Sequence, residues 1–168
     1  MSKSYEAYLS ENPIDRFSFY TQHHITILTR VGQEIEDLLD EAVDGDTISH
    51  SEFERAYGLF WLWVLGAFEV IRTMFPARKC FSTDIQNSLK ASKKRLVQIR
   101  TPMAKQEYTR PKENIRGELS VSEFNADTKD FCLSIKDEKY WARALIREFN
   151  QLMSSIRPDD IVATSREH

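Results

Sequence analysis

The sequence predicts a mainly α domain, an up-and-down four-helix bundle with a β-hairpin inserted before the last helix. Two observations predict it. Apolar residues recur at intervals of three and four over four long stretches, which is the period of an amphipathic helix. Between residues 119 and 135 the period changes to alternation, which is typical of strands with one buried face. At 168 residues the chain fits a single domain, 1–168.

The first helix is expected over residues 14–43. Pro13 and Asp15 are typical of a helix start. The Asp44-Gly45-Asp46 triplet favours a turn that ends the helix. Between these signals runs an apolar stripe made of Phe17, Tyr20, His24, Ile27, Val31, Ile35, Leu38 and Ala42.

The second helix, over residues 52–75, contains thirteen consecutive uncharged residues from Ala56 to Phe68. A helix that is apolar on every side must be covered on every side, and a membrane span takes about 20 such residues. We therefore expect a central helix and no membrane span. A capping box at Ser49 or Ser51, each with a glutamate three residues on, is expected to start it.

Charged residues interrupt the apolar pattern of this second helix at Glu69 and Arg72, which lie three apart and so on one side of it. Burial there would oblige both to find partners. We expect a buried polar network of Glu69, Arg72 and the stripe residue His24, with Arg100 as a partner of Glu69. The network is either structural or part of a functional polar site.

The third helix is expected over residues 83–104, with Ser82 as its cap and its lysines pointing away from the core. Pro102 should end or kink it near Thr101. The hairpin follows at 119–135, with turn residues at 125–129 between its strands. Asp137 is expected to cap the last helix, over residues 138–157, and a frayed tail, 158–168, completes the chain.

Composition and motifs exclude several classes of protein. A hydrophobic content of 41% and a charged content of 29% are typical of a globular protein. Cys80 and Cys132 lie far apart without a CxxC pattern, and the adjacent His23 and His24 point in different directions, so neither a disulfide scaffold nor a metal site is expected. Without a secretory signal, a Gly-rich phosphate loop or a nucleophile elbow, we expect a cytoplasmic protein without a cofactor and without motif-bearing enzyme chemistry.

Charge is distributed unevenly, although the net charge is only −3. Residues 90–112 carry eight basic residues against one acid, whereas residues 30–46 carry seven acids against one base. The basic segment favours a polyanion or an acidic partner. The candidate ligand-binding residues are Lys90, Lys93, Lys94, Arg100 and Lys105.

The segment from Ile99 to Tyr108 is the most specific local feature of the chain. An arginine at a helix end followed by an apolar break is expected to bring Arg100, Lys105, Glu107 and Tyr108 together. One interpretation is a solvated helix end. The other is an anion or RNA contact surface, in which Arg100 and Lys105 bind phosphate and Tyr108 stacks on a base.

An apolar helix ending in Gly66-Ala67-Phe68-Glu69, then a helix ending in Leu96-Val97-Gln98-Ile99-Arg100 and a short break, resembles the HEPN superfamily. The resemblance covers roughly residues 51–108. It implies a compact helical domain, often dimeric, of the kind found in RNA-cutting toxins and defence systems and in non-catalytic members. Arg100 matches the arginine of the active members' motif and Thr101 its polar position, but Lys105 stands where a histidine is required. Lysine, with a pKa near 10.4, stays charged where histidine would exchange a proton.

The leading hypothesis is a non-catalytic HEPN-like binding or regulatory domain whose basic third helix contacts RNA or an acidic protein. One alternative is a metal-independent ribonuclease in which Arg100 stabilises the transition state and Lys105 or Tyr108 carries the proton. Another is a homodimeric interaction protein in which the basic segment docks on the acidic segment of a second copy.

Overall fold

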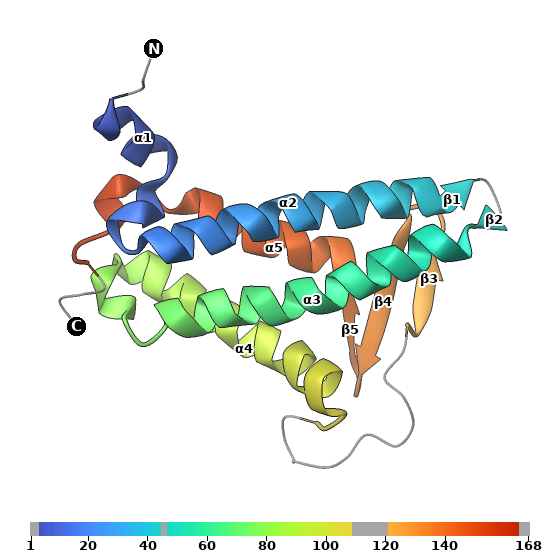
Figure 1. Ribbon diagram of the computed structural model, residues 1–168. Coiled ribbons are helices and arrows are strands. Elements are labelled where there is room, and N and C mark those ends of the chain that lie inside the picture. Colours follow the sequence, from blue (N-terminus) through green and yellow to red (C-terminus); the bar gives the residue numbers. More distant parts are fainter. Residues whose placement is uncertain (1–3, 45–46, 109–120, 165–168) are drawn as a thin grey trace.

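The computed structural model describes residues 4–44, 47–108 and 121–164. Four long helices form a bundle (Figure 1): α2 (Phe19–Ala42), α3 (His50–Met74), α4 (Thr83–Lys105) and α5 (Ala142–Ser155). A three-stranded antiparallel sheet precedes α5 and has the order β3 (Glu123–Asn125), β4 (Asp130–Ile135), β5 (Glu138–Trp141). The predicted fold class, a mainly α bundle with a β-hairpin inserted before the last helix, is confirmed.

The long helices α2 and α3 lie side by side, and the sheet lies at the end of the bundle where α2 ends and α3 begins (Figure 1). A short hairpin of β1 (Val43–Asp44) and β2 (Thr47–Ile48) joins the two helices. The predicted start of the first helix was wrong, because residues 13–16 form the 3-10 turn η1 (Pro13–Arg16). Ser18, whose Oγ accepts the N–H of Thr21 at 3.3 Å, caps α2 instead.

The short helix α1 (Tyr5–Glu11) was not predicted from the sequence. Leu9 is its only buried residue, so it lacks the recurring apolar stripe that reveals an amphipathic helix. At the starts of α3 and α4 the sequence located the cap residues, Ser49 and Ser82, but not their bonds. The predicted capping box of α3 is not formed, because the hydroxyls of Ser49 and Ser51 both donate to the carboxylate of Glu52 and neither side chain caps a backbone N–H.

The core of the bundle centres on Trp63, which is fully buried. Its indole Nε1 donates to the carbonyl of Leu28 at 3.1 Å. One turn further along α2, a Cβ atom at Gly32 would lie 2.8 Å from Cγ2 of Ile146 and 3.5 Å from the indole nitrogen of Trp63. The missing side chain of Gly32 therefore allows α2, α3 and α5 to meet at close range.

The expectation that α3 is covered on every side was wrong. Phe60, Trp63 and Val64 are fully buried, but Trp61 is 38% exposed and Leu62 is 55% exposed. The neighbouring helices cover only one side of α3, and its outer side is open to solvent in the single chain.

Helix α4 continues through Pro102 to Lys105, one residue beyond its predicted end. Pro102 has no N–H to donate to the carbonyl of Gln98, yet the helix persists for another turn. It ends at Gln106, which adopts the left-handed conformation with φ 55° and donates its N–H to the carbonyl of Pro102 at 2.8 Å.

The sheet contains one strand more than predicted. Residues 138–141 form β5 and not the first turn of the last helix, because Lys136, with φ 57°, turns the chain back so that Glu138 pairs with Ile135. The first strand of the hairpin lies at 123–125, next to a turn in which Oδ1 of Asn125 accepts the N–H of Thr128 at 3.0 Å. The predicted strand residue Leu119 lies outside the described residues.

Asp130, and not the predicted Asp137, satisfies the start of α5. Its Oδ1 accepts the backbone N–H groups of Phe131 at 2.9 Å and of Arg143 at 3.2 Å. Burial raises the pKa of the Asp130 carboxyl, and these two N–H groups, together with the charges of Arg143 and Arg147, oppose the rise.

Two cations tie the sheet to the end of α2. Arg143 donates from Nη2 to the carbonyl of Glu36 at 3.1 Å and to Oδ1 of Asp40 at 2.7 Å, and from Nε to the carbonyl of Lys129 at 3.1 Å. Lys129 in turn donates from Nζ to the carbonyls of Asp40 and Val43, at 2.9 Å and 3.2 Å. Carbonyls at a helix end need such partners.

The tail is not frayed as far as Thr164, contrary to the prediction for residues 158–168. Asp160, at the end of the 3-10 turn η3 (Pro158–Asp160), accepts the hydroxyl of Ser82 at 2.6 Å. Beyond it, Val162 donates its N–H to the carbonyl of Cys80 at 2.8 Å, and Ile161 forms an antiparallel bridge with Phe81. Residues 165–168 lie outside the described residues.

Within the described ranges, every helix falls short of the length or the apolar character needed to cross a lipid bilayer.

Two helical glycines, at positions 32 and 58, give a matched test of the helix crossing. Gly58→Ala should stabilise the protein by about 0.5–1 kcal/mol, because the added Cβ meets nothing within 4 Å and alanine favours the helix. Gly32→Ala should destabilise it by roughly 1–2 kcal/mol, since Cγ2 of the β-branched Ile146 cannot swing away from the new methyl group. Urea unfolding measures both changes. A stabilising Gly32→Ala would contradict the close crossing.

Candidate nucleic-acid interface

The predicted basic residues of α4 lie on one contiguous half of the helix. At 100° per residue their positions span about 140°. We call this set the basic face, and its members are Lys90, Lys93, Lys94, Arg100 and Lys105. Lys90, Lys94 and Lys105 are exposed, and none of the three forms an ion pair with a described residue. By contrast, Arg95 lies on the opposite flank and pairs with Glu148 of α5 at 2.8 Å.

Two members of the basic face rest on aromatic rings of α3. The Nζ of Lys93 lies 3.8 Å from the centroid of Phe75, whose ring also contacts the guanidinium of Arg78 at 4.7 Å. The guanidinium of Arg100 lies 5.3 Å from the centroid of Phe68. These cation–π contacts hold the two α4 side chains along the seam between α3 and α4 while leaving their charges unpaired by acids.

The predicted buried polar network is wrong. Glu69 and Arg72 do pair, at 2.6 Å, but their side chains are 47% and 59% exposed, and Arg100 lies over Phe68 and not beside Glu69. His24 is exposed, and with Glu69 it lines an open groove of about 410 Å³ between α2 and α3. The reason is that the outer side of α3 is open. The Glu69–Arg72 pair lies in solvent there, so water solvates both charges and neither needs a buried partner.

The structure does not bring Arg100, Lys105 and Tyr108 together. Because α4 does not break at Pro102, Arg100 and Lys105 are five residues apart on one helix, and so point about 140° apart. Tyr108 lies beyond the helix end, where the Nζ of Lys136 is 5.3 Å from its ring centroid. The expected cluster of polar side chains at this helix end is therefore not formed.

Three of the seven acids in the predicted acidic segment, residues 30–46, face arginines of the same chain. Glu34 faces Arg55 of α3 at 4.0 Å, Glu36 faces Arg147 of α5 at 3.5 Å, and Asp40 binds Arg143 at 2.7 Å. Part of the segment predicted to attract a basic partner is thus already paired with arginines, whereas three lysines of the basic face have no acidic partner among the described residues.

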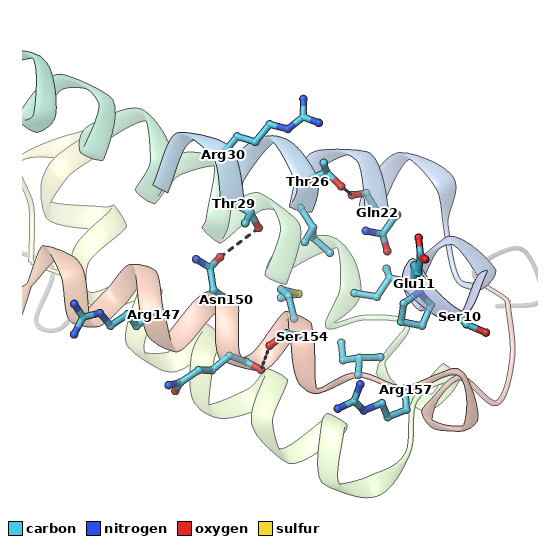
Figure 2. Close-up of a pocket in the computed structure, with 16 residues that line it drawn as sticks. Ser10, Glu11, Gln22, Thr26, Thr29, Arg30, Arg147, Asn150, Ser154 and Arg157 are labelled. Atoms are coloured by element: carbon cyan, nitrogen blue, oxygen red, sulfur yellow. Dashed lines mark hydrogen bonds between the residues drawn. The ribbon is translucent and has the colours of Figure 1, made fainter. Parts of the chain in front are cut away.

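A groove of about 630 Å³ between the first half of α2 and the second half of α5 was missed by sequence reasoning (Figure 2). Its floor is formed by buried side chains of Ile14, Ile25, Met153 and Ile156. Thr29 and Asn150, which bond across it at 3.3 Å, are 121 residues apart, so no local pattern could indicate it.

The charges around this groove do not converge. Figure 2 shows the guanidinium of Arg30 pointing away from the groove, and those of Arg147 and Arg157 at opposite ends of it. Arg147 also faces Glu36. The groove therefore offers an apolar floor with a polar rim, and not a focused anion site.

The two cysteines, Cys80 and Cys132, are buried and form no disulfide, and the thiol of Cys80 donates to the carbonyl of Thr164 at 3.5 Å. Among the residues that the structure describes, no group of three or more histidine, cysteine or carboxylate side chains could hold a metal ion.

Comparison of the chain with known protein families, with curated proteins and with solved structures gave no match. The resemblance to HEPN domains therefore stays a prediction.

Arg100→Ala should lower the free energy of unfolding by less than about 1 kcal/mol, since it removes a ring contact at a half-exposed position. Arg143→Ala is the matched control and should cost at least about 2 kcal/mol, because it removes charged hydrogen bonds from a side chain that is only 11% exposed. Thermal and urea unfolding of both variants check this. A loss of about 3–5 kcal/mol from Arg100→Ala would instead indicate a buried ion pair.

Proposed function

We propose that this protein is a non-catalytic, HEPN-like binding module that binds RNA through the basic face of α4. The observation that carries the proposal is the contrast between the two charged segments. Three acids of α2, at positions 34, 36 and 40, face arginines of the same chain, while Lys90, Lys94 and Lys105 have no acidic partner among the described residues. Phosphates that bind these three lysines would release counterions, which favours binding, and would not have to break ion pairs within the protein.

One exposed ring favours RNA over an acidic protein as the partner. Phe68 is buried beneath Arg100 and Phe75 lies beneath Lys93, but Trp61, which continues their line along the seam between α3 and α4, is 38% exposed. An exposed ring beside a row of cations is typical of surfaces that bind single-stranded nucleic acid. An acidic protein would use the cations alone.

Within the HEPN-like interpretation, Arg100 would serve as a phosphate contact and not as part of a catalytic pair. The ribonuclease alternative requires Lys105 or Tyr108 to act together with Arg100. The separation of about 140° on α4 and the position of Tyr108 beyond the helix end do not favour it. A cytoplasmic location remains part of the proposal, since disulfides are rare in that compartment and Cys80 and Cys132 form none.

The proposal predicts that the double variant Lys90→Glu/Lys94→Glu loses most of its affinity for a single-stranded RNA at moderate salt. The slope of log K against log salt should also fall by about 1.4, because each phosphate contact on a single strand contributes about 0.7. Fluorescence anisotropy with a labelled oligoribonucleotide measures both quantities.

Arg30→Glu is the matched control for Lys94→Glu, because it makes the same charge change on α2, at a distance from the basic face, and should leave affinity nearly unchanged. Equal loss in the two single variants would mean that only net charge matters. Displacement of the RNA by an equal charge of polyglutamate would favour an acidic protein partner. Cleavage of the RNA that disappears with Lys105→Ala would favour the ribonuclease alternative.

A homodimer is the second candidate, and the open outer side of α2 and α3 favours it. Tyr20 is 74% exposed, Ile27 43% and Leu62 55%, and the Glu69–Arg72 pair beside them could be exchanged with that of a second copy. The candidate predicts a doubled mass by light scattering at high protein concentration and a single mass for Leu62→Asp. A wild-type chain that stays monomeric at millimolar concentration would rule it out.

A further inference from the structure

Three aromatic residues form a regular line on one flank of α3. The line consists of Trp61, Phe68 and Phe75, which are spaced by seven residues. Seven residues fall only about 20° short of two full helical turns, so the rings stand one above another along the helix. Each contacts α4. The contacts are made by the carbonyl of Met103, the guanidinium of Arg100 and the ammonium of Lys93.

Trp61 differs from the other two rings in what covers it. Phe68 is 8% exposed and lies beneath Arg100, and Phe75 lies between Lys93 and Arg78. The ring of Trp61 is 38% exposed, and α4 holds it at its edge, where Nε1 donates to the carbonyl of Met103 at 3.1 Å. No other described ring or cation covers its face.

The anchored indole is a preorganised surface. A side chain that is already fixed loses little conformational entropy when a ligand stacks on it. The bond to Met103 also fixes the ring at the end of the basic face where Arg100 and Lys105 lie. Along α4 the basic face extends about 22 Å from Lys90 to Lys105, enough for several nucleotides of a single strand.

We propose that Trp61 is a stacking platform for one unpaired base of a single-stranded RNA whose phosphates follow the basic face. This inference rests on the proposed function and adds selectivity for single strands to it. Bases inside a duplex have both faces covered by their neighbours and cannot stack on the indole, whereas a single strand can turn a base outward.

Trp61→Leu tests the platform, with a labelled 12-nucleotide single strand and the same strand annealed to its complement as probes. The variant should weaken single-strand binding by about tenfold and leave duplex binding and the salt slope unchanged, because no phosphate contact is lost. Trp61→Phe should retain most of the affinity. Leu62→Ala, an exposed apolar neighbour outside the ring line, is the matched control and should bind as the wild type does.

Acrylamide quenching of indole fluorescence gives a second readout. The chain has three tryptophans, of which Trp63 is fully buried and Trp141 is partly buried, so the measurement uses a Trp141→Phe background. Single-stranded RNA should then protect the fluorescence of Trp61 from acrylamide, while duplex should not. Equal weakening of both probes by Trp61→Leu, or unchanged single-strand affinity, would overturn the platform. If the platform fails in this way but Lys94→Glu still weakens RNA binding, the proposed function stands without the platform. Wild-type protein that binds neither probe would overturn both.

Discussion

The arrangement of the whole bundle depends on the absence of one side chain, at Gly32. Because α2 carries no Cβ there, Ile146 of α5 and the indole of Trp63 on α3 can all reach the same point. The carbonyl of Leu28, one turn away, satisfies the polar edge of the indole, which would otherwise be buried without a partner. Three helices are thus fixed at one crossing. This crossing sets the orientation of α3, and with it which side of α3 faces solvent and which side contacts α4.

The periodic parts of the fold could be predicted from the sequence, and the parts that depend on tertiary contacts could not. The apolar stripes of α2, α4 and α5 and the uncharged run of α3 revealed the bundle, and Ser82 marked the start of α4. Residues 138–141 had no such signal, because the left-handed turn at Lys136, and not the local pattern, directs them into the sheet. The docking of Asp160 on Ser82 is likewise invisible in a sequence where the two residues are 78 apart.

The candidate site shows the same division. The basic face could be located by counting charges along the sequence, because exposed lysines on a helix do not depend on tertiary partners. The expected network of Glu69, Arg72 and His24 failed because an uncharged run was interpreted as evidence of burial on every side. Trp61 and Leu62 belong to that run yet face solvent, and the polar residues near them are free to pair at the surface. Which side of an apolar helix stays open depends on how many neighbours the fold supplies.

The seven-residue spacing of rings on α3 and of Lys93 and Arg100 on α4 also fixes the register of these two helices. A slide by one turn would move both cations off their rings at once and carry the indole of Trp61 away from the Met103 carbonyl. The next register that restores ring–cation matches lies a full repeat away, about 10 Å along the axis. These contacts therefore oppose sliding of α4 along α3, which keeps the rings and the lysines of the basic face at a fixed spacing.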